Sequence, residues 1–240
     1  MGDYECAAEY YDLLYEGEKD YAAEVALLAS MIRTGNVNAT SVLDVGCGTG
    51  AHVRGLLDVG FEVSGIDVEP AFIALARAKC PDGAFFVGDM RSFDLPHRFD
   101  VVTCLFSAIG YVKTENELRA AVRRMRDHLS PGGLLLIDPW FEPGQLTPGW
   151  ISTLVGRNDD VTVCRMARTV IDGAISRLDF EYLIGTAAGI ERRSEVHELG
   201  LFTQEQMEKA FMAAGLTVER REKALRTRGI YIGSAPMDAQ

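Results

Sequence analysis

A run of glycines at alternate positions is the feature of this sequence best suited to binding a ligand. Residues 43–50 read LDVGCGTG, in which Asp44 precedes Gly46, Gly48 and Gly50. Glycine lets a backbone turn sharply and approach a ligand closely, because no Cβ stands in the way. The amides exposed at the start of the helix that follows can hold an anionic group. The segment therefore predicts a strand–turn–helix unit whose loop binds a cofactor.

Acidic residues also follow the next two predicted strands. Asp67 closes a strand over 61–66, and Asp89 and Met90 come directly after a strand over 84–88. In an open α/β sheet, ligands bind at the carboxyl ends of the strands, where a carboxylate can accept hydrogen bonds from a ribose. We therefore predict that Asp67 binds a ribose. The alternative interpretation is an N-cap for the helix that begins near residue 70.

The elements that must position these residues alternate along the first half of the chain. Short runs rich in valine and isoleucine alternate with longer helical stretches, a pattern typical of an α/β fold with a mostly parallel sheet and helices on both faces. We expect strands over 41–46, 61–66, 84–88, 99–105 and 133–138, and helices over 51–59, 70–80 and 115–129. The segment Ser130-Pro131-Gly132-Gly133 is expected to end the last helix.

The pattern changes after Asp138. Between about 160 and 200 the chain predicts a three-stranded antiparallel β-meander, VTVCRMARTV, ISRLDFEYLIG and IERRSEVHELG, with Asp172-Gly173 in a hairpin turn. A helix over 203–214 opens with a capping box, and two strands, LTVERREK and GIYIGSA, complete the fold. Without a linker or repeat, we expect one domain over 1–240, with 160–200 as a β insertion.

Composition narrows the class of protein. The chain has 240 residues, enough for one well-filled α/β domain, and a formal net charge of −11. That charge disfavours nucleic acids and anionic membranes as partners. The N-terminus carries acids where a signal peptide carries lysine or arginine, and no apolar run reaches the length of a membrane span. We expect a soluble, cytoplasmic protein. The five cysteines are scattered and no acidic cluster is present, so we expect neither disulfides nor a metal.

The spacing of the glycines distinguishes between two cofactors. A dinucleotide-binding loop reads G-x-G-x-x-G, whereas this loop reads G-x-G-x-G and follows an acid. It resembles motif I of the class I S-adenosylmethionine methyltransferases, which implies a Rossmann-like, seven-stranded sheet. The resemblance implies that Asp44 supports the methionine amino group and that the glycine loop accommodates the methionine and ribose parts. It also implies that Asp89 and the Met90 amide bind adenine, with an ordinary turn aspartate as the alternative. Phe106 is expected beside the adenine and the methyl donor, with a plain core phenylalanine as its alternative.

A closer resemblance covers nearly the whole chain. AEYYDLLYEGEKDYAAE, GDMRSFDL, VTCLFSAIGY, the SPGG…DPWF segment and ELGLFTQEQMEKAFMAAGL are similar to the sugar N,N-dimethyltransferases of macrolide biosynthesis. Those enzymes act on dTDP-linked 3-amino-3,6-dideoxyhexoses of the desosamine and mycaminose pathways. The resemblance implies that the β insertion lies on the substrate side. Two blocks differ: the family's SSIGH reads SAIGY here, which puts Tyr111 in place of a histidine, and its EPWW reads DPWF.

Four residues are candidates for the catalytic part of the site. Tyr11 matches a tyrosine in the family's N-terminal YD motif, which closes over the cofactor, although ordinary helix packing is an equal alternative. His197 matches a family histidine, with a cross-strand hydrogen bond as its alternative. Asp138 ends the fifth predicted strand, where donor and acceptor would meet, and Tyr111 lies where the acceptor is expected. The resemblance does not identify a general base.

Three further residues are candidates for substrate binding. Trp140 belongs to the DPWF block beside the acceptor, while Arg177 and Arg228 fall at positions that match the family. A nucleotide sugar carries a diphosphate, which requires cations, so we predict phosphate contacts for both arginines. Solvated surface charge is the alternative for each.

These residues together predict an S-adenosylmethionine-dependent N-methyltransferase that acts on a small-molecule amine, with a dTDP-linked amino sugar of an antibiotic pathway as the favoured acceptor. An enzyme of the same fold that methylates another natural-product amine or a hydroxyl is the nearest alternative. A nicotinamide-dependent oxidoreductase and a cofactor-binding protein without catalysis are more distant alternatives. The sequence leaves open the number of methyl groups added and the oligomeric state. A homodimer is compatible with the sequence.

Overall fold

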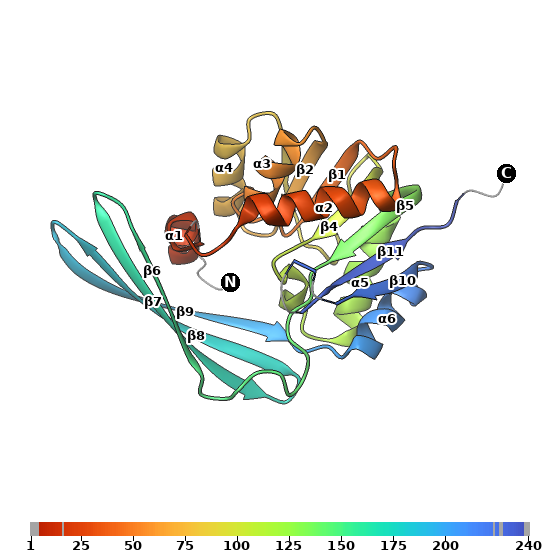
Figure 1. The fold of residues 1–240 in the computed structure, drawn as a ribbon. Helices are drawn as coiled ribbons and strands as arrows, with labels where there is room; N and C mark the ends of the chain where they lie inside the picture. The colour runs from red at the N-terminus through yellow and green to blue at the C-terminus, as the bar shows by residue number, and fades with distance from the viewer. Residues whose placement is uncertain (1–4, 16, 223, 226–227, 238–240) are drawn as a thin grey trace.

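Two separate β-sheets organise the chain (Figure 1). The computed structural model describes residues 5–15, 17–222, 224–225 and 228–237. The larger sheet has seven strands in the order β10-β11-β5-β4-β1-β2-β3. They are β1 (Ser41–Val45), β2 (Glu62–Asp67), β3 (Ala84–Val87), β4 (Phe99–Cys104), β5 (Leu129–Ile137), β10 (Thr217–Arg221) and β11 (Ile230–Ser234). All pairings are parallel except those of β11, which confirms the predicted mostly parallel, seven-stranded sheet.

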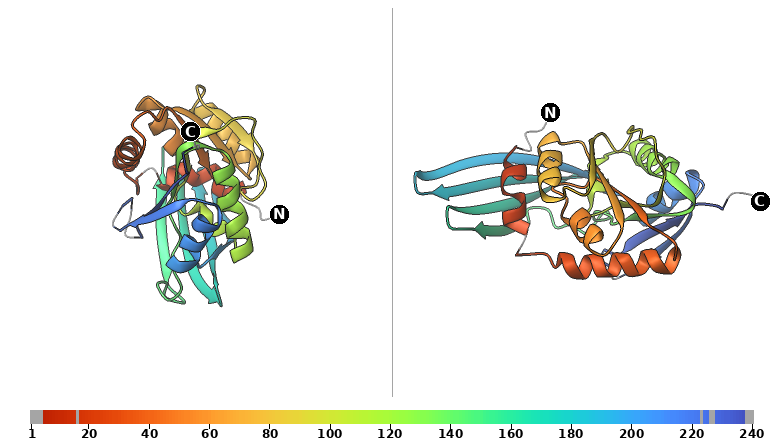
Figure 2. Two further views of the ribbon diagram at one scale, coloured as in Figure 1. Left: turned by 90° about the vertical axis from the view of Figure 1, so that its right-hand side faces the viewer. Right: turned by 90° about the horizontal axis from the view of Figure 1, so that it is seen from above.

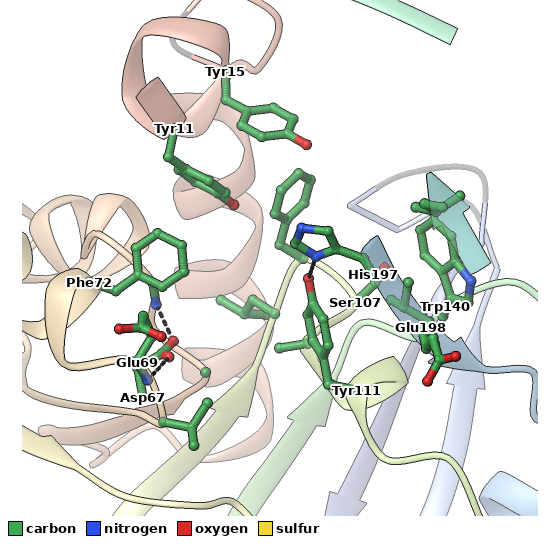
Figure 3. Close-up of a pocket in the computed structure, with 18 of the residues that line it drawn as sticks. Tyr11, Tyr15, Asp67, Glu69, Phe72, Ser107, Tyr111, Trp140, His197 and Glu198 are labelled. Atoms are coloured by element: carbon green, nitrogen blue, oxygen red, sulfur yellow. Dashed lines mark hydrogen bonds between the residues drawn. The ribbon is translucent and has the colours of Figure 1, made fainter. Parts of the chain in front are cut away.

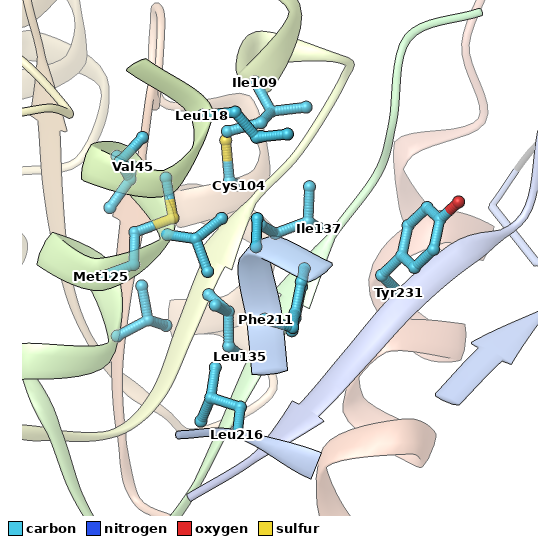
Figure 4. Packing of buried hydrophobic residues seen from close by; sticks show 14 of the residues in the cluster. Val45, Cys104, Ile109, Leu118, Met125, Leu135, Ile137, Phe211, Leu216 and Tyr231 are labelled. Atoms are coloured by element: carbon cyan, nitrogen blue, oxygen red, sulfur yellow. The ribbon is translucent and has the colours of Figure 1, made fainter. Parts of the chain in front are cut away.

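Helices cover both faces of this sheet because its strands point apolar side chains to each face in turn. On β5, Leu134 and Leu136 face one core, while Leu135 and Ile137 face the other. The first core is completed by α2 (Tyr21–Gly35), α3 (Ala51–Asp58) and α4 (Pro70–Lys79), and the second by α5 (Glu115–Asp127) and α6 (Gln204–Ala213). Figure 4 shows the second core. No helix in the described ranges is long and apolar enough to cross a membrane.

One predicted helix start is confirmed, and one predicted helix end is not. The capping box predicted at residue 203 is present, since the Thr203 side chain accepts from the Gln206 amide and the Gln206 side chain accepts from the Thr203 amide. The expectation that Ser130-Pro131-Gly132-Gly133 ends the helix is wrong, because α5 already ends at Asp127 and these residues lie inside β5. The strand accommodates them by a register shift against β4 and by a positive φ of 71° at Gly132.

The β insertion has four strands rather than the predicted three. They are β6 (Ile151–Arg157), β7 (Val161–Asp172), β8 (Ile175–Thr186) and β9 (Gly189–Gly200), paired antiparallel in that order. The insertion therefore begins at Ile151, earlier than 160. The hairpin turn predicted at Asp172-Gly173 is confirmed, since Asp172 pairs with Ile175. The strand predicted at LTVERREK is β10, which covers only Thr217–Arg221. Lys223, at the end of that segment, lies outside the described residues.

A short helix, α1 (Glu5–Tyr15), lies between the two sheets (Figures 1 and 2). Toward the insertion, Tyr10 and Leu14 pack in one apolar cluster with side chains of β7 and β8. Gly156 of β6 allows the close approach, because a Cβ there would lie 2.4 Å from the Leu13 carbonyl oxygen. Toward the seven-stranded sheet, Asp12 accepts hydrogen bonds from Thr49 and Lys79 at 2.6 Å each. The helix therefore joins the glycine loop to the insertion.

Candidate active site

A cavity of about 920 Å³ lies between the carboxyl ends of the central strands, α1 and the inner face of the insertion. Most of the predicted site residues line it, as Figure 3 shows for several of them. In that view Asp67, Glu69 and Phe72 lie on one side, and Tyr111, His197 and Trp140 on the other, with Tyr11 and Tyr15 above. The size is near the upper end of the range of about 300–1,000 Å³ for small-molecule sites.

The glycine loop has the backbone that its sequence predicts. Gly46, Gly48 and Gly50 have φ angles of 75°, 53° and 81°, in the left-handed region that favours glycine. A Cβ at Gly46 would lie 2.6 Å from the Ala108 Cβ, so this position cannot hold a side chain without movement. The Gly48 amide donates to Asp67 Oδ2 at 2.8 Å. The loop thus lines the cavity and is tied to the end of β2.

Asp67 ends β2 and lines the cavity with a half-buried carboxylate. Oδ1 accepts from the Glu69 amide at 3.0 Å, while burial, opposed by these backbone hydrogen bonds, raises the pKa of the carboxyl above its usual value. The N-cap of α4 is Glu69, which accepts from the Ala71 amide, rather than Asp67. The helix-cap alternative for Asp67 is therefore not what the structure shows.

Asp44 lies beneath the glycine loop and is 1 % exposed. Thr103 Oγ1 donates to its Oδ1 at 2.7 Å. Burial raises the pKa of this carboxyl to about 6. Asp44 is not among the residues that line the cavity.

The residues predicted beside adenine and the methyl donor line the cavity. Met90 and Asp89 both line it. Asp89 Oδ1 accepts a hydrogen bond from Arg91 Nε at 2.9 Å, and this bond lowers the pKa of the Asp89 carboxyl. Phe106 and Ser107 have positive φ angles of 52° and 63°. Such strained conformations in residues other than glycine cluster at functional sites.

A buried ionic group beside the cavity was missed in the sequence. Glu24 Oε2 lies 3.1 Å from Lys19 Nζ and 2.9 Å from His52 Nε2. Burial alone would raise the pKa of Glu24, but hydrogen bonding to His52 and the charge of Lys19 hold it below its usual value. The Lys19 ammonium also lies 3.7 Å from the Phe106 ring centroid. His52, which looks like an ordinary helix residue in sequence, lines the cavity beside Tyr21.

Aromatic side chains of α1 close the cavity from above. The Tyr11 ring lies 4.7 Å from Tyr15 and 5.5 Å from Phe72, measured between centroids. Burial raises the pKa of the Tyr11 hydroxyl well above its usual value, so the phenol stays protonated. Arg165 of β7, which the sequence did not suggest, donates to the Tyr15 hydroxyl at 2.9 Å and lies 4.4 Å from the Phe180 centroid.

The opposite wall carries the predicted acceptor-side residues. The Tyr111 hydroxyl lies 2.8 Å from His197 Nδ1, so the structure brings these two candidates together. Trp140 lines the cavity and donates through Nε1 to Ser176 Oγ at 2.8 Å. His197 of β9 thus meets Tyr111, which lies in the segment that follows β4.

Arg228 joins the ends of β4 and β5. It donates to the Pro139 carbonyl and to Ser107 Oγ, both at 2.9 Å, and its Nη2 lies 3.8 Å from Asp138 Oδ1. Arg228 lines the cavity, whereas Asp138 is buried behind it.

The structure does not bring Arg177 into the cavity. Successive side chains of a strand point to opposite faces, and Leu178, Phe180 and Tyr182 of β8 line the cavity. Arg177 therefore lies on the outer face, where its Nε donates to Asp179 at 2.8 Å. Within the described ranges, no group of three or more histidine, cysteine or acidic side chains is placed to hold a metal ion.

Comparison with known proteins identifies relatives over nearly the full length. A methyltransferase-domain family model matches residues 42–133. The dTDP-3-amino-3,6-dideoxy-alpha-D-glucopyranose N,N-dimethyltransferase of Streptomyces fradiae is 40% identical over 94% of this chain and 89% of its own. An amino pentose methyltransferase of calicheamicin biosynthesis from Micromonospora echinaspora, solved with S-adenosylmethionine bound, is 40% identical with a TM-score of 0.85, over 93% of this chain and 95% of its own. DesVI of Streptomyces venezuelae has 38% identity and a TM-score of 0.90, over 95% and 98%.

Proposed function

Because the chain belongs to the family of dTDP-amino-sugar N,N-dimethyltransferases, we propose that this S-adenosylmethionine-dependent N-methyltransferase acts on the amine of a nucleotide-linked amino sugar. The observation that carries the proposal is the continuous cavity that runs from the glycine loop to the inner face of the insertion. Such a cavity gives the cofactor and the acceptor adjoining places. In this interpretation the chain is one methyltransferase domain with the insertion on the substrate side.

The cofactor half of the cavity suits S-adenosylmethionine on the chemistry of its donors. The Asp67 carboxylate would take the ribose hydroxyls, the glycine loop the methionine and ribose parts, and Asp44 the methionine ammonium through its charge. Asp89, the Met90 amide and Phe106 would surround the adenine end and the methyl donor. When bound, S-adenosylmethionine supplies an electrophilic methyl group.

The acceptor half must hold an amine as its free base. An alkyl amine has a pKa near ~10 and is mostly protonated at neutral pH, so the site selects the free base or accepts a proton. Tyr11, Tyr111 and His197 surround the space in which the amine would lie, and Asp138 lies behind it. Holding the amine in line with the methyl donor is a proximity effect worth up to ~7–11 kcal/mol in well-oriented systems.

A nucleotide diphosphate requires cations at the wall of the cavity. Arg228 lines it between Trp140 and Phe141 and fits this role. Arg165 is a second cavity-lining cation, and its Nε has no hydrogen-bond partner among the described residues. Because Arg177 faces away from the cavity, we assign the second phosphate contact to Arg165 instead.

The proposal extends to the setting of the reaction. We infer a cytoplasmic enzyme of antibiotic biosynthesis that handles small molecules only and that is free to form a homodimer. The net charge of −11 supports the exclusion of nucleic acids and anionic membranes. The relative from calicheamicin biosynthesis supports the pathway class.

Calorimetric titration tests the proposal in two steps. The protein is first titrated with S-adenosylhomocysteine, and thymidine diphosphate is then added to the saturated complex. We expect both to bind, with the second weakened in Arg228→Ala. Binding of S-adenosylhomocysteine alone would overturn the nucleotide-sugar acceptor and favour another amine or a hydroxyl. Failure of both to bind would overturn the methyltransferase assignment.

A further inference from the structure

A chain of polar side chains runs from the cavity into the inner face of the insertion. Tyr111 lies in a short 3₁₀ helix, η1 (Ala108–Tyr111), directly after β4, and 41 % of its surface is exposed. Its hydroxyl meets Nδ1 of His197, which is 5 % exposed and lies against the Phe180 ring at 4.5 Å between centroids. Tyr111 thus faces the cavity while its hydrogen-bond partner is shielded from water.

Glu195 stands two residues before His197 on the same face of β9. Its Oε2 lies 3.4 Å from His197 Nε2 and accepts from the Tyr182 hydroxyl at 3.0 Å, and the residue is 7 % exposed. A carboxylate accepts hydrogen bonds, so this contact places the imidazole proton on Nε2. Nδ1 is then left as the acceptor for the Tyr111 hydroxyl. A carboxylate that holds a histidine in one tautomer is a recurrent device in catalytic sites.

We propose that Tyr111, His197 and Glu195 form a proton-accepting triad, in which Tyr111 receives a proton from the acceptor nitrogen and Glu195 positions His197. The inference rests on the proposed function, which it deepens. Tyr111 is the catalytic residue of the three, and His197 and Glu195 act through it.

The proton balance of the step is simple. A primary amine that has gained a methyl group is a secondary ammonium, and one N–H proton must leave before the nitrogen can gain another methyl group. That proton passes to the Tyr111 oxygen as the Tyr111 proton passes to His197 Nδ1. The resulting imidazolium is paired with the Glu195 carboxylate, and His197 later releases the proton to water through the cavity. No oxidant, reductant or further reactant is needed.

The charged and titratable neighbours of His197 are compatible with this role. Tyr111 and Glu195 contact the ring directly, and Tyr182 and Arg165 stand behind Glu195. From α1, Tyr11 lines the same cavity as Tyr111.

At the rim of the cavity, Lys113 and Glu198 form an exposed ion pair of opposite charges. Glu195 stands at the His197 ring, and its charge stabilises the imidazolium.

The test is Glu195→Gln, which removes the charge and keeps the shape. Without the carboxylate, the His197 imidazolium is less stable and the ring is a weaker base. We expect kcat at neutral pH to fall about 10-fold or more, with the KM of the acceptor unchanged and the acid limb of the pH profile moved to lower pH. In the NMR titration of the four histidines, the His197 resonance, assigned from a His197→Gln variant, should also titrate at lower pH. Glu181→Gln, on the outer face of β8, is the matched control and should change none of these.

Two results would each overturn the triad. If kcat falls equally at every pH and the His197 titration does not move, Glu195 is only structural and the triad is wrong. If Tyr111→Phe retains the wild-type kcat, Tyr111 does not accept the proton and the triad is equally wrong. Calorimetry with S-adenosylhomocysteine and thymidine diphosphate keeps the proposed function separate, because both should bind Glu195→Gln as they bind the wild type.

Discussion

The substitution Asp44→Asn should make the free protein more stable at neutral pH while it weakens cofactor binding. The carboxylate is buried beneath the glycine loop, where it accepts a hydrogen bond from Thr103 Oγ1. An asparagine amide oxygen can accept the same hydrogen bond. The substitution therefore removes a buried charge and little else.

The size of the effect follows from the raised pKa of the carboxyl. A pKa of about 6 in the folded protein, against the ordinary 3.8, means that the native state binds more protons than the unfolded chain between these values. The free energy of unfolding therefore falls as pH rises from about 4 to about 6. Since each pKa unit corresponds to ~1.4 kcal/mol, the cost above pH 6 is about 3 kcal/mol. Asp44→Asn should recover up to that amount at pH 7.5 and little at pH 4.5.

Urea unfolding at several pH values measures this difference. The variant and the wild type should have equal m values and midpoints that diverge as pH rises, while Asp82→Asn, at an exposed turn, should follow the wild type throughout. At pH 7.5 the affinity of Asp44→Asn for S-adenosylhomocysteine should fall about 10-fold or more, because the ligand ammonium loses its counter-charge. A variant no more stable than wild type at pH 7.5, or a stability gap that is the same at both pH values, would refute the reasoning.

Three further predictions concern separate parts of the molecule. Asp67→Ala should weaken S-adenosylhomocysteine binding by about 2 kcal/mol or more, because two ribose hydrogen bonds to a charged group are lost; unaltered affinity in calorimetry would remove the ribose assignment. Arg228→Ala should raise the KM of a nucleotide sugar about 10-fold or more with unchanged S-adenosylhomocysteine affinity, and an unchanged KM would end the phosphate role. Phe211→Ala, at a fully buried side chain of α6, should lower the free energy of unfolding by about 3–5 kcal/mol in urea, whereas the exposed Phe86→Ala should cost little.

Local signals in the sequence predicted most of the larger sheet and its helices. Leu118, Val122 and Met125 recur at helical spacing, and all three are buried in α5. The glycine loop adopts the positive φ angles that its composition suggests. These features depend on neighbouring residues, which is why reasoning from the sequence reaches them.

Features set by contacts far apart in the chain were not predictable in this way. Tyr111 and His197 are separated by 86 positions, and Arg165 and Tyr15 by 150. Their meeting depends on the register of β7 to β9 and on where α1 lies. The strand β6 was missed because it pairs only with β7 at the sheet edge, and much of its side-chain surface is exposed, which leaves a weak apolar signal.

The position of α1 has a thermodynamic consequence for how two ligands bind in the cavity. One face of the helix is tied to the glycine loop through Asp12, and the other packs on the insertion through Tyr10 and Leu14. Any ligand that fixes the helix in place also completes the wall that the other ligand meets. The conformational entropy of fixing α1 is then lost once and shared between cofactor and acceptor. By linkage, each ligand must strengthen the binding of the other by the same factor.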